Sequence, residues 1–96
     1  MPRYAARVDA NQPEIVEALR GVGATVAHLH TLGNGVPDIC AGYRGVNYLI
    51  EIKDGRKPPS RQKLTDDEET FFADWRGQVA IASSVDEALA IIGATT

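Results

Sequence analysis

The apolar residues near the start of the chain recur every three or four positions, which is the period of a helix with one buried face. The recurring residues are Ile15, Val16, Leu19 and Val22. Asn11 and Glu14 stand where a capping box would close the first turn. Gly21 and Gly23 follow and favour a stop. The pattern therefore predicts a helix over residues 12–22.

The pattern then changes to β-prone segments separated by turns. We predict strands over residues 25–30, 38–41 and 47–53, with a turn at 42–45 between the last two. In the third strand the residues Leu49, Glu51 and Lys53 alternate with Tyr48, Ile50 and Ile52. The two sets are expected on opposite faces of the sheet. The charged end of this strand should then emerge at the rim of the core.

Two further capping boxes predict the remaining helices. Thr65 to Glu68 opens one helix and Ser84 to Glu87 opens the other, with a short buried strand over 78–82 between them. The first of these helices carries an aromatic stripe of Phe71, Phe72 and Trp75. At helical spacing in a small domain such a stripe is more often part of the core than a platform for stacking bases. The predicted order is αβββαβα, an α/β domain around a small mixed sheet.

Length and composition predict one domain over residues 1–96. The chain has 96 residues, of which 44% are hydrophobic, and this suffices for a single core. Its one cysteine, Cys40, excludes an internal disulfide and suits a reducing compartment. No apolar run has the length of a membrane span and no leader opens the chain. We expect a soluble, cytoplasmic protein with no membrane association and no organic cofactor.

Residues 1–9 lack a periodic pattern and are predicted to form an arm on the domain; they include Arg3, Tyr4 and Arg7.

Charge is distributed unevenly along the chain. The formal net charge is −3, which does not favour binding to phosphate. Residues 53–63 nevertheless hold five basic side chains and one acid. A nucleic acid would therefore bind at this connector, unless the connector is only a solvated loop. The basic side chains expected to contact phosphate are Arg56, Lys57, Arg61 and Lys63.

Chemically active residues gather at Pro37-Asp38 and at Glu51-Ile52-Lys53. Two neighbouring carboxylates repel each other unless a cation lies between them, and hard oxygen ligands suit Mg²⁺ or Mn²⁺. Asp38, Glu51 and the backbone carbonyl of Ile52 are the predicted ligands. Such a cation would activate a water toward a phosphodiester, and Lys53 would either lower the pKa of that water or stabilise charge developing at phosphorus. The alternative is a solvated strand end with an ion pair.

His28 and His30 share one face of the first predicted strand and are a second hypothesis for a metal site. No cysteine or third histidine completes a tetrahedral zinc site with them. His30 is alternatively placed to contact phosphate from the loop that leads to Asp38.

Pro37-Asp38 followed by Glu51-Ile52-Lys53 resembles the motif of the PD-(D/E)XK nuclease superfamily, whose common core is αβββαβ. The resemblance is closer to the VRR-Nuc group, small nucleases related to Holliday-junction resolvases. Segments 64–68 and 84–89 look like those that follow the lysine in that group. The match covers about residues 9–89. It implies a restriction-endonuclease-like core with an extra C-terminal helix, in which Asp38, Glu51 and Lys53 are the catalytic residues.

The resemblance also implies accessory residues. The group usually carries an acid and then a glutamine on its first helix. Gln12 matches the glutamine, and Asp9 is the nearest substitute for the acid, with Glu14 as the alternative. Many relatives have a glutamine where this chain has Glu68, which therefore either faces the site or serves only its capping box.

The resemblance implies a divalent-metal-dependent endonuclease that acts on DNA. Branched, junction or flap DNA is expected, because no base-reading module accompanies the core. Cutting both strands would need a homodimer, and repair or recombination in a phage or mobile element would suit so small a domain. Two alternatives stay open: a nucleic-acid-binding or complex-forming module that kept the fold but lost hydrolysis, and a nuclease directed at RNA.

Overall fold

The computed structural model describes residues 8–94, and the arm predicted around Arg3, Tyr4 and Arg7 lies outside the described residues. The predicted order of elements is confirmed. The helices and strands are α1 (Gln12–Gly21), β1 (Thr25–His28), β2 (Ile39–Tyr43), β3 (Val46–Ile52), α2 (Asp66–Asp74), β4 (Val79–Ala82) and α3 (Val85–Ile91), with a 3₁₀ turn, η1, at Pro59–Arg61. Within the described part of the chain no helix is both long and apolar enough to cross a bilayer.

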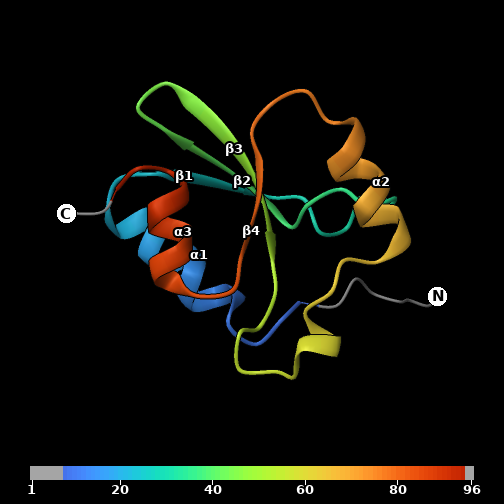
Figure 1. The fold of residues 1–96 in the computed structure, drawn as a ribbon. Coiled ribbons are helices and arrows are strands. Elements are labelled where there is room, and N and C mark those ends of the chain that lie inside the picture. Colours follow the sequence, from blue (N-terminus) through green and yellow to red (C-terminus); the bar gives the residue numbers. More distant parts are fainter. Residues whose placement is uncertain (1–7, 95–96) are drawn as a thin grey trace.

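The strands form one mixed sheet in the order β1-β2-β3-β4. β1 pairs with β2 and β2 with β3 in antiparallel fashion, whereas β3 and β4 are parallel. Parallel neighbours need a crossover connection, and here the crossover carries η1 and α2. Figure 1 shows α1 and α3 together on one side of the sheet and α2 on the other. The predicted α/β class with a small mixed sheet is confirmed.

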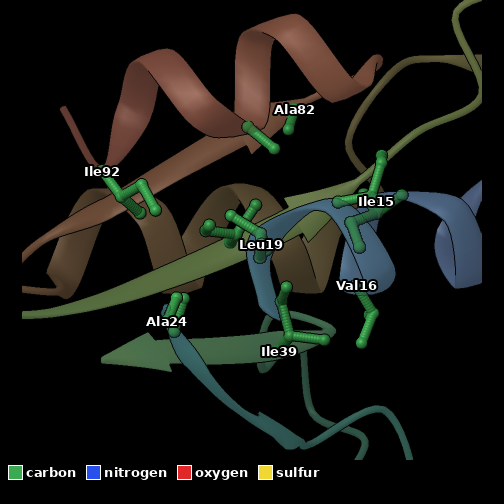
Figure 2. Close-up of a cluster of buried hydrophobic side chains, with 11 residues drawn as sticks. Ile15, Val16, Leu19, Ala24, Ile39, Ala82 and Ile92 are labelled. Carbon is green, nitrogen blue, oxygen red and sulfur yellow. The ribbon is translucent and has the colours of Figure 1, made fainter. Parts of the chain in front are cut away.

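The core fills the space between the sheet and the α1–α3 pair (Figure 2). Ile15 and Leu19 of α1 are fully buried against Ile39 of β2 and Ile50 of β3. Side chains alternate along β3. Since Ile50 and Ile52 face this core, Leu49, Glu51 and Lys53 face the side of α2, as the alternation predicted.

The cap predicted for α1 is wrong. The Asn11 side chain accepts no hydrogen bond from the first turn of α1. Its Nδ2 instead donates to the carbonyl of Lys53 at 3.0 Å and to that of Ser83 at 3.4 Å. Asn11 therefore connects the start of α1 to the ends of β3 and β4. These partners lie far away in sequence, so the local pattern carries no sign of them.

The aromatic stripe of α2 is not part of the core, contrary to the prediction. No residue of α2 is buried, and Trp75, which follows the helix, is 45% exposed. The Phe71 and Trp75 rings stack on each other with their centroids 5.0 Å apart. The capping box predicted at Thr65 and Glu68 is confirmed in both of its hydrogen bonds. α2 is therefore stabilised at its start by local bonds and carries its aromatic rings outside the core.

Candidate active site

Asp38 and Glu51 meet across neighbouring strands. Ile39 pairs with Ile50 in the antiparallel register of β2 and β3. One step further along the same register, Asp38 stands opposite Glu51. Residues directly opposite in an antiparallel pair have their Cβ atoms about 4.5–5.5 Å apart on the same face. The sheet thus brings the two predicted acids together on the α2 side.

Pro37 continues this register opposite Ile52 and changes the hydrogen bonding there. The backbone N–H of Ile52 donates to Oδ2 of Asp38 at 2.7 Å. Pro37 has no N–H, so it has nothing to donate to the carbonyl of Ile52 that faces it. The ladder stops at this point. The carbonyl of the same residue, Ile52, is the one predicted as a ligand.

Lys53 and Glu68 complete the group of charges. Nζ of Lys53 lies 3.4 Å from Oε2 of Glu51 and 2.9 Å from Oε1 of Glu68. The same Oε1 of Glu68 accepts the backbone N–H of Thr65 at 2.9 Å. Glu68 was predicted either to face the site or to serve only its capping box. Its carboxylate does both, because it caps α2 and contacts Lys53. The side chains of Lys53 and Glu51 are only 12% and 5% exposed, so this pair is held away from water.

Negative charge exceeds positive charge among these side chains. Burial raises the pKa of Glu51 to about 9, and its hydrogen bond with Glu68 and the charge of Asp38 act in the same direction. Burial also raises the pKa of Asp38, although the hydrogen bond from Ile52 opposes this. Without a cation, Glu51 therefore keeps its proton at neutral pH.

The pKa values of Lys53 and Glu68 lie on the charged side of their usual range. Burial lowers the pKa of Lys53, but its bonds to Glu68 and Glu51 outweigh burial, and the pKa is raised. Burial raises the pKa of Glu68, but hydrogen bonds from Glu51, the amide of Thr65 and Lys53 outweigh it, and the pKa is lowered. Lys53 and Glu68 consequently form a charged pair beside a protonated Glu51.

The residues fit a divalent cation in charge and in ligand chemistry. Oε1 of Glu51 is buried and has no hydrogen-bond partner within residues 8–94. Asp38, Glu51 and the carbonyl of Ile52 are hard oxygen donors of the kind that Mg²⁺ and Mn²⁺ prefer. No group of three or more His, Cys, Asp or Glu side chains in the described part of the chain is arranged to hold a metal ion. A cation here would complete its shell with water or substrate oxygens, as Mg²⁺ usually does.

Gly35 places α2 close to the site, a role that the sequence did not reveal. The backbone of Gly35 has φ +79°, and a Cβ at this position would collide with the carbonyl of Asp67 and lie 2.9 Å from the nitrogen of Glu68. The loop before β2 therefore touches the first turn of α2 directly. Only a residue without a side chain permits this approach, and it brings Glu68 within reach of Lys53.

The accessory residues that the resemblance predicts near the first helix lie in three different places. Asp9 lies near enough to Asp38 for its charge to contribute to the raised pKa of that carboxyl, and its Oδ1 is 3.5 Å from Nζ of Lys57. Glu14 is exposed and lines a hollow near the start of α3. Gln12 is buried and lines a cavity between α1 and β1. Of the two acids, Asp9 is the one that the fold brings to Asp38.

The basic side chains of the connector differ in their surroundings. Arg56 binds the buried Asp54 through Nε at 3.0 Å and through a second nitrogen at 3.2 Å. Lys57 pairs with Asp9. Arg61 and Lys63 are exposed, and neither has an ion-pair partner among residues 8–94. These two side chains are therefore accessible to a ligand.

Comparison with known proteins gives one relevant structure. No family model and no curated protein matches the sequence. Among solved structures, a chain described as a VRR_NUC domain matches with a TM-score of 0.56 and 27% sequence identity, and the match covers 84% of this chain and 88% of that chain. The two folds thus align over most of both chains. The predicted resemblance to the VRR-Nuc group, and with it the restriction-endonuclease-like fold of the PD-(D/E)XK nuclease superfamily, is confirmed.

Proposed function

We propose that the protein is a divalent-metal-dependent endonuclease that hydrolyses phosphodiester bonds in DNA. The observation that carries the proposal is the placement of Asp38 opposite Glu51, with Lys53 3.4 Å from Glu51 on the same face. Its likeness to a solved VRR_NUC domain supports nuclease chemistry.

Asp38, Glu51 and the carbonyl of Ile52 would hold Mg²⁺ or Mn²⁺. A bound cation of this kind supplies Lewis-acid chemistry toward a phosphodiester and its attacking water. The burial of Glu51 excludes bulk water from one side of the site, so electrostatic interactions there are stronger than at an exposed surface. The hydrogen bond from Ile52 fixes the direction of the Asp38 carboxylate.

Lys53 would act on the scissile phosphate. Its ammonium group is positioned by Glu51 and Glu68 on either side, and the raised pKa keeps it charged. A fixed positive charge beside phosphorus favours the transition state, in which negative charge builds up on the phosphoryl oxygens. Glu68 is a positioning residue in this arrangement, because its carboxylate contacts Lys53 and also accepts the backbone N–H of Thr65 at the start of α2.

The substrate would be bound through phosphate. Arg61 and Lys63 are the exposed, unpaired cations of the connector that follows β3. Contacts to phosphate give affinity without sequence preference, and residues 8–94 contain no separate base-reading helix or zinc module. We propose selectivity for branched, junction or flap DNA, and a role in phage or mobile-element repair or recombination.

One copy of the chain offers one site, so cutting both strands of a junction requires two copies. We propose a homodimer. Analytical ultracentrifugation should show a species of twice the chain mass. The fraction of protein in this species should rise when junction DNA is added. A monomer at all concentrations, with or without DNA, would contradict the dimer but not the chemistry.

The direct test is cleavage of labelled linear, forked, four-way-junction and RNA substrates in Mg²⁺ or Mn²⁺. Cleavage of branched DNA above the other substrates is expected, and cleavage of RNA alone would assign the RNA-directed alternative. Glu51→Gln and Lys53→Ala should each lower the rate by at least a hundredfold. The exposed Glu69→Gln is the matched control and should cut at the rate of wild type, whereas unaffected cleavage by Glu51→Gln would reveal a contaminating nuclease.

A binding module that has lost hydrolysis is the second candidate. It is favoured by one observation, the lack of a three-side-chain metal cluster within residues 8–94. Calorimetric titration of Mn²⁺ into wild type and into Asp38→Ala separates the two. Binding that Asp38→Ala abolishes supports the endonuclease, and no binding by wild type refutes it.

A further inference from the structure

A cavity on the other side of the sheet holds polar groups that the proposed site does not use. It lies between α1 and β1 and measures about 430 Å³. Its lining includes Gln12 and Val16 of α1 together with His28 and His30, whereas Asp38, Glu51 and Lys53 are not among the described residues that line it. Its size falls in the range of small-ligand pockets.

Gln12 is the central polar group of this cavity. It lies on the same face of α1 as Ile15, Val16 and Leu19, and it is only 2% exposed. Neither its Oε1 nor its Nε2 has a hydrogen-bond partner within residues 8–94. A buried amide without a partner costs about 1–3 kcal/mol, and an apolar residue would fit this core position without that cost. The position therefore needs an explanation beyond packing.

His30 adds a second unpaired group in the same place. Its Nδ1 is buried without a partner in the described part of the chain. The rings of His28 and His30 meet edge to face with centroids 5.8 Å apart, and His28 is exposed. Of the five buried side-chain atoms without partners in residues 8–94, three belong to Gln12 and His30. The unmet hydrogen bonds of this part of the chain are thus concentrated in one cavity.

The chemistry of the lining selects a class of ligand. Arg20 and Glu17 at the rim carry opposite charges, so the cavity attracts neither an anion nor a cation strongly. Within the described residues, no third His, Cys, Asp or Glu side chain joins His28 and His30 in a group that could hold a metal ion. An amide offers one donor and one acceptor side by side, which matches the edge of a nucleobase, and glutamine pairs with adenine in this way. Histidine rings stack on bases that have left the helix.

We propose that this cavity binds an unpaired nucleobase, with Gln12 reading its edge and the histidine pair packing against its face. The cavity is near the proposed active site although it opens on the opposite face. Leu29, which separates His28 from His30, donates its backbone N–H to the carbonyl of Asp38 at 2.8 Å. This bond joins the segment that carries the two histidines, at the edge of the sheet formed by β1, to a residue of the proposed site. The identification of this base as part of a DNA substrate rests on the proposed function; the binding of a base does not.

The test uses the full chain without metal and the four deoxynucleosides, which contain no phosphodiester. The side-chain amide signal of Gln12 is followed by ¹H–¹⁵N NMR. Deoxyadenosine at millimolar concentration should shift this signal and those of the His28 and His30 rings. Gln12→Leu should weaken binding at least tenfold, equivalent to about 1.4 kcal/mol. Gln78→Leu makes the same change on an exposed residue and should bind as wild type does.

Two outcomes would overturn the proposal: no shift with any deoxynucleoside, or binding that survives Gln12→Leu. The first would mean that the cavity holds only water. If Gln12→Leu fails to fold, His30→Leu takes its place and should weaken binding several-fold. Because cleavage plays no part in this measurement, its failure leaves the nuclease proposal untouched.

A second arm identifies the source of the base. A single-stranded oligodeoxyadenylate should compete with deoxyadenosine, while a duplex of the same sequence should not, because its bases are stacked and paired. If neither oligonucleotide competes, the ligand is a free nucleoside or nucleotide, and the link to a DNA substrate is refuted.

Discussion

At the scale of the residue, Glu51 is held in surroundings that disfavour its charge. Its pKa of about 9 lies above the ordinary value of 4.5, so the folded protein binds a proton here that the unfolded chain releases. Stability of the metal-free protein is therefore fully present below about pH 4.5 and falls as the pH rises toward 9, with a slope of at most about 1.4 kcal/mol per pH unit.

Glu51→Gln should remove this dependence and make the metal-free protein more stable at pH 7 to 9. Urea unfolding in a chelator at several pH values measures the effect, and Glu69→Gln, exposed on α2, should keep the slope of wild type. If the unfolding free energies of wild type and Glu51→Gln depend on pH in the same way, the pKa of Glu51 is not raised by folding.

Asn11 is a second residue whose effect extends beyond its own helix. Its Nδ2 bonds the carbonyls of Lys53 and Ser83. Asn11→Ala should lower the free energy of unfolding by about 1–3 kcal/mol, since the part-buried carbonyl of Lys53 loses its hydrogen bond from Nδ2. Asn47→Ala removes an exposed amide and should change stability by no more than about 0.5 kcal/mol. Equal effects of the two substitutions in denaturant unfolding would refute the bridging role.

At the scale of the element, the contact between Gly35 and α2 makes a sharp comparison possible. Gly33 and Gly35 both have positive φ, at +70° and +79°, but nothing lies within 4 Å of a Cβ built at Gly33. Gly33→Ala should therefore cost only the backbone strain, about 1–2 kcal/mol. Gly35→Ala adds a collision with Asp67 and should cost about 2–4 kcal/mol.

The same pair reports on the site. When α2 is displaced in Gly35→Ala, Lys53 loses Glu68, and burial should then bring its pKa below the value in wild type. Gly33→Ala should leave the pKa of Lys53 unchanged. NMR titration of the Lys53 side chain measures both, and an unchanged pKa in Gly35→Ala would show that the loop does not position α2.

The elements also show what the sequence can and cannot predict. The Thr65–Glu68 box was predictable because both partners lie within one turn of the same helix. The alternation along β3 was predictable because Ile50 and Ile52 must face the core. The partners of Asn11 are 42 and 72 residues away, and no local pattern contains them. The prediction that Phe71 and Trp75 belong to the core is wrong. Helical spacing shows that residues share one face of a helix, but it does not show whether the rest of the protein packs on that face.

The candidate site follows the same division. Asp38, Glu51 and Lys53 could be selected from their types and spacing, and the fold brings them together. The contribution of Pro37 depends on its position opposite Ile52, and that of Gly35 depends on contact with a helix more than thirty residues later. The cavity around Gln12 and His30 joins residues from α1 and the end of β1, which the sequence treats as separate features.

At the scale of the whole molecule, a small basic region works against a net charge of −3. Binding of DNA should therefore be weak at physiological salt and fall steeply as salt is added. Changing both Arg61 and Lys63 to glutamine should weaken binding and lower the slope of log affinity against log salt by about 2.

Fluorescence anisotropy with DNA in the Asp38→Ala background, in which we expect no cleavage, measures this slope. Arg44→Gln removes one charge at the β2–β3 turn, at the other end of the strands from the site, and should leave the slope unchanged. An equal effect of Arg44→Gln would indicate that the connector has no special part in binding.

The structure of α2 has a consequence for motion. Core helices such as α1 open only when most of the domain unfolds, but α2 buries no residue of its own. Segments with few buried apolar contacts open locally at a fraction of the global unfolding free energy. Hydrogen exchange at α2 should then be fast while α1 and β3 remain protected. During each such opening Lys53 is released from Glu68, so the ammonium group of Lys53 alternates between a position restrained by Glu68 and a freer one.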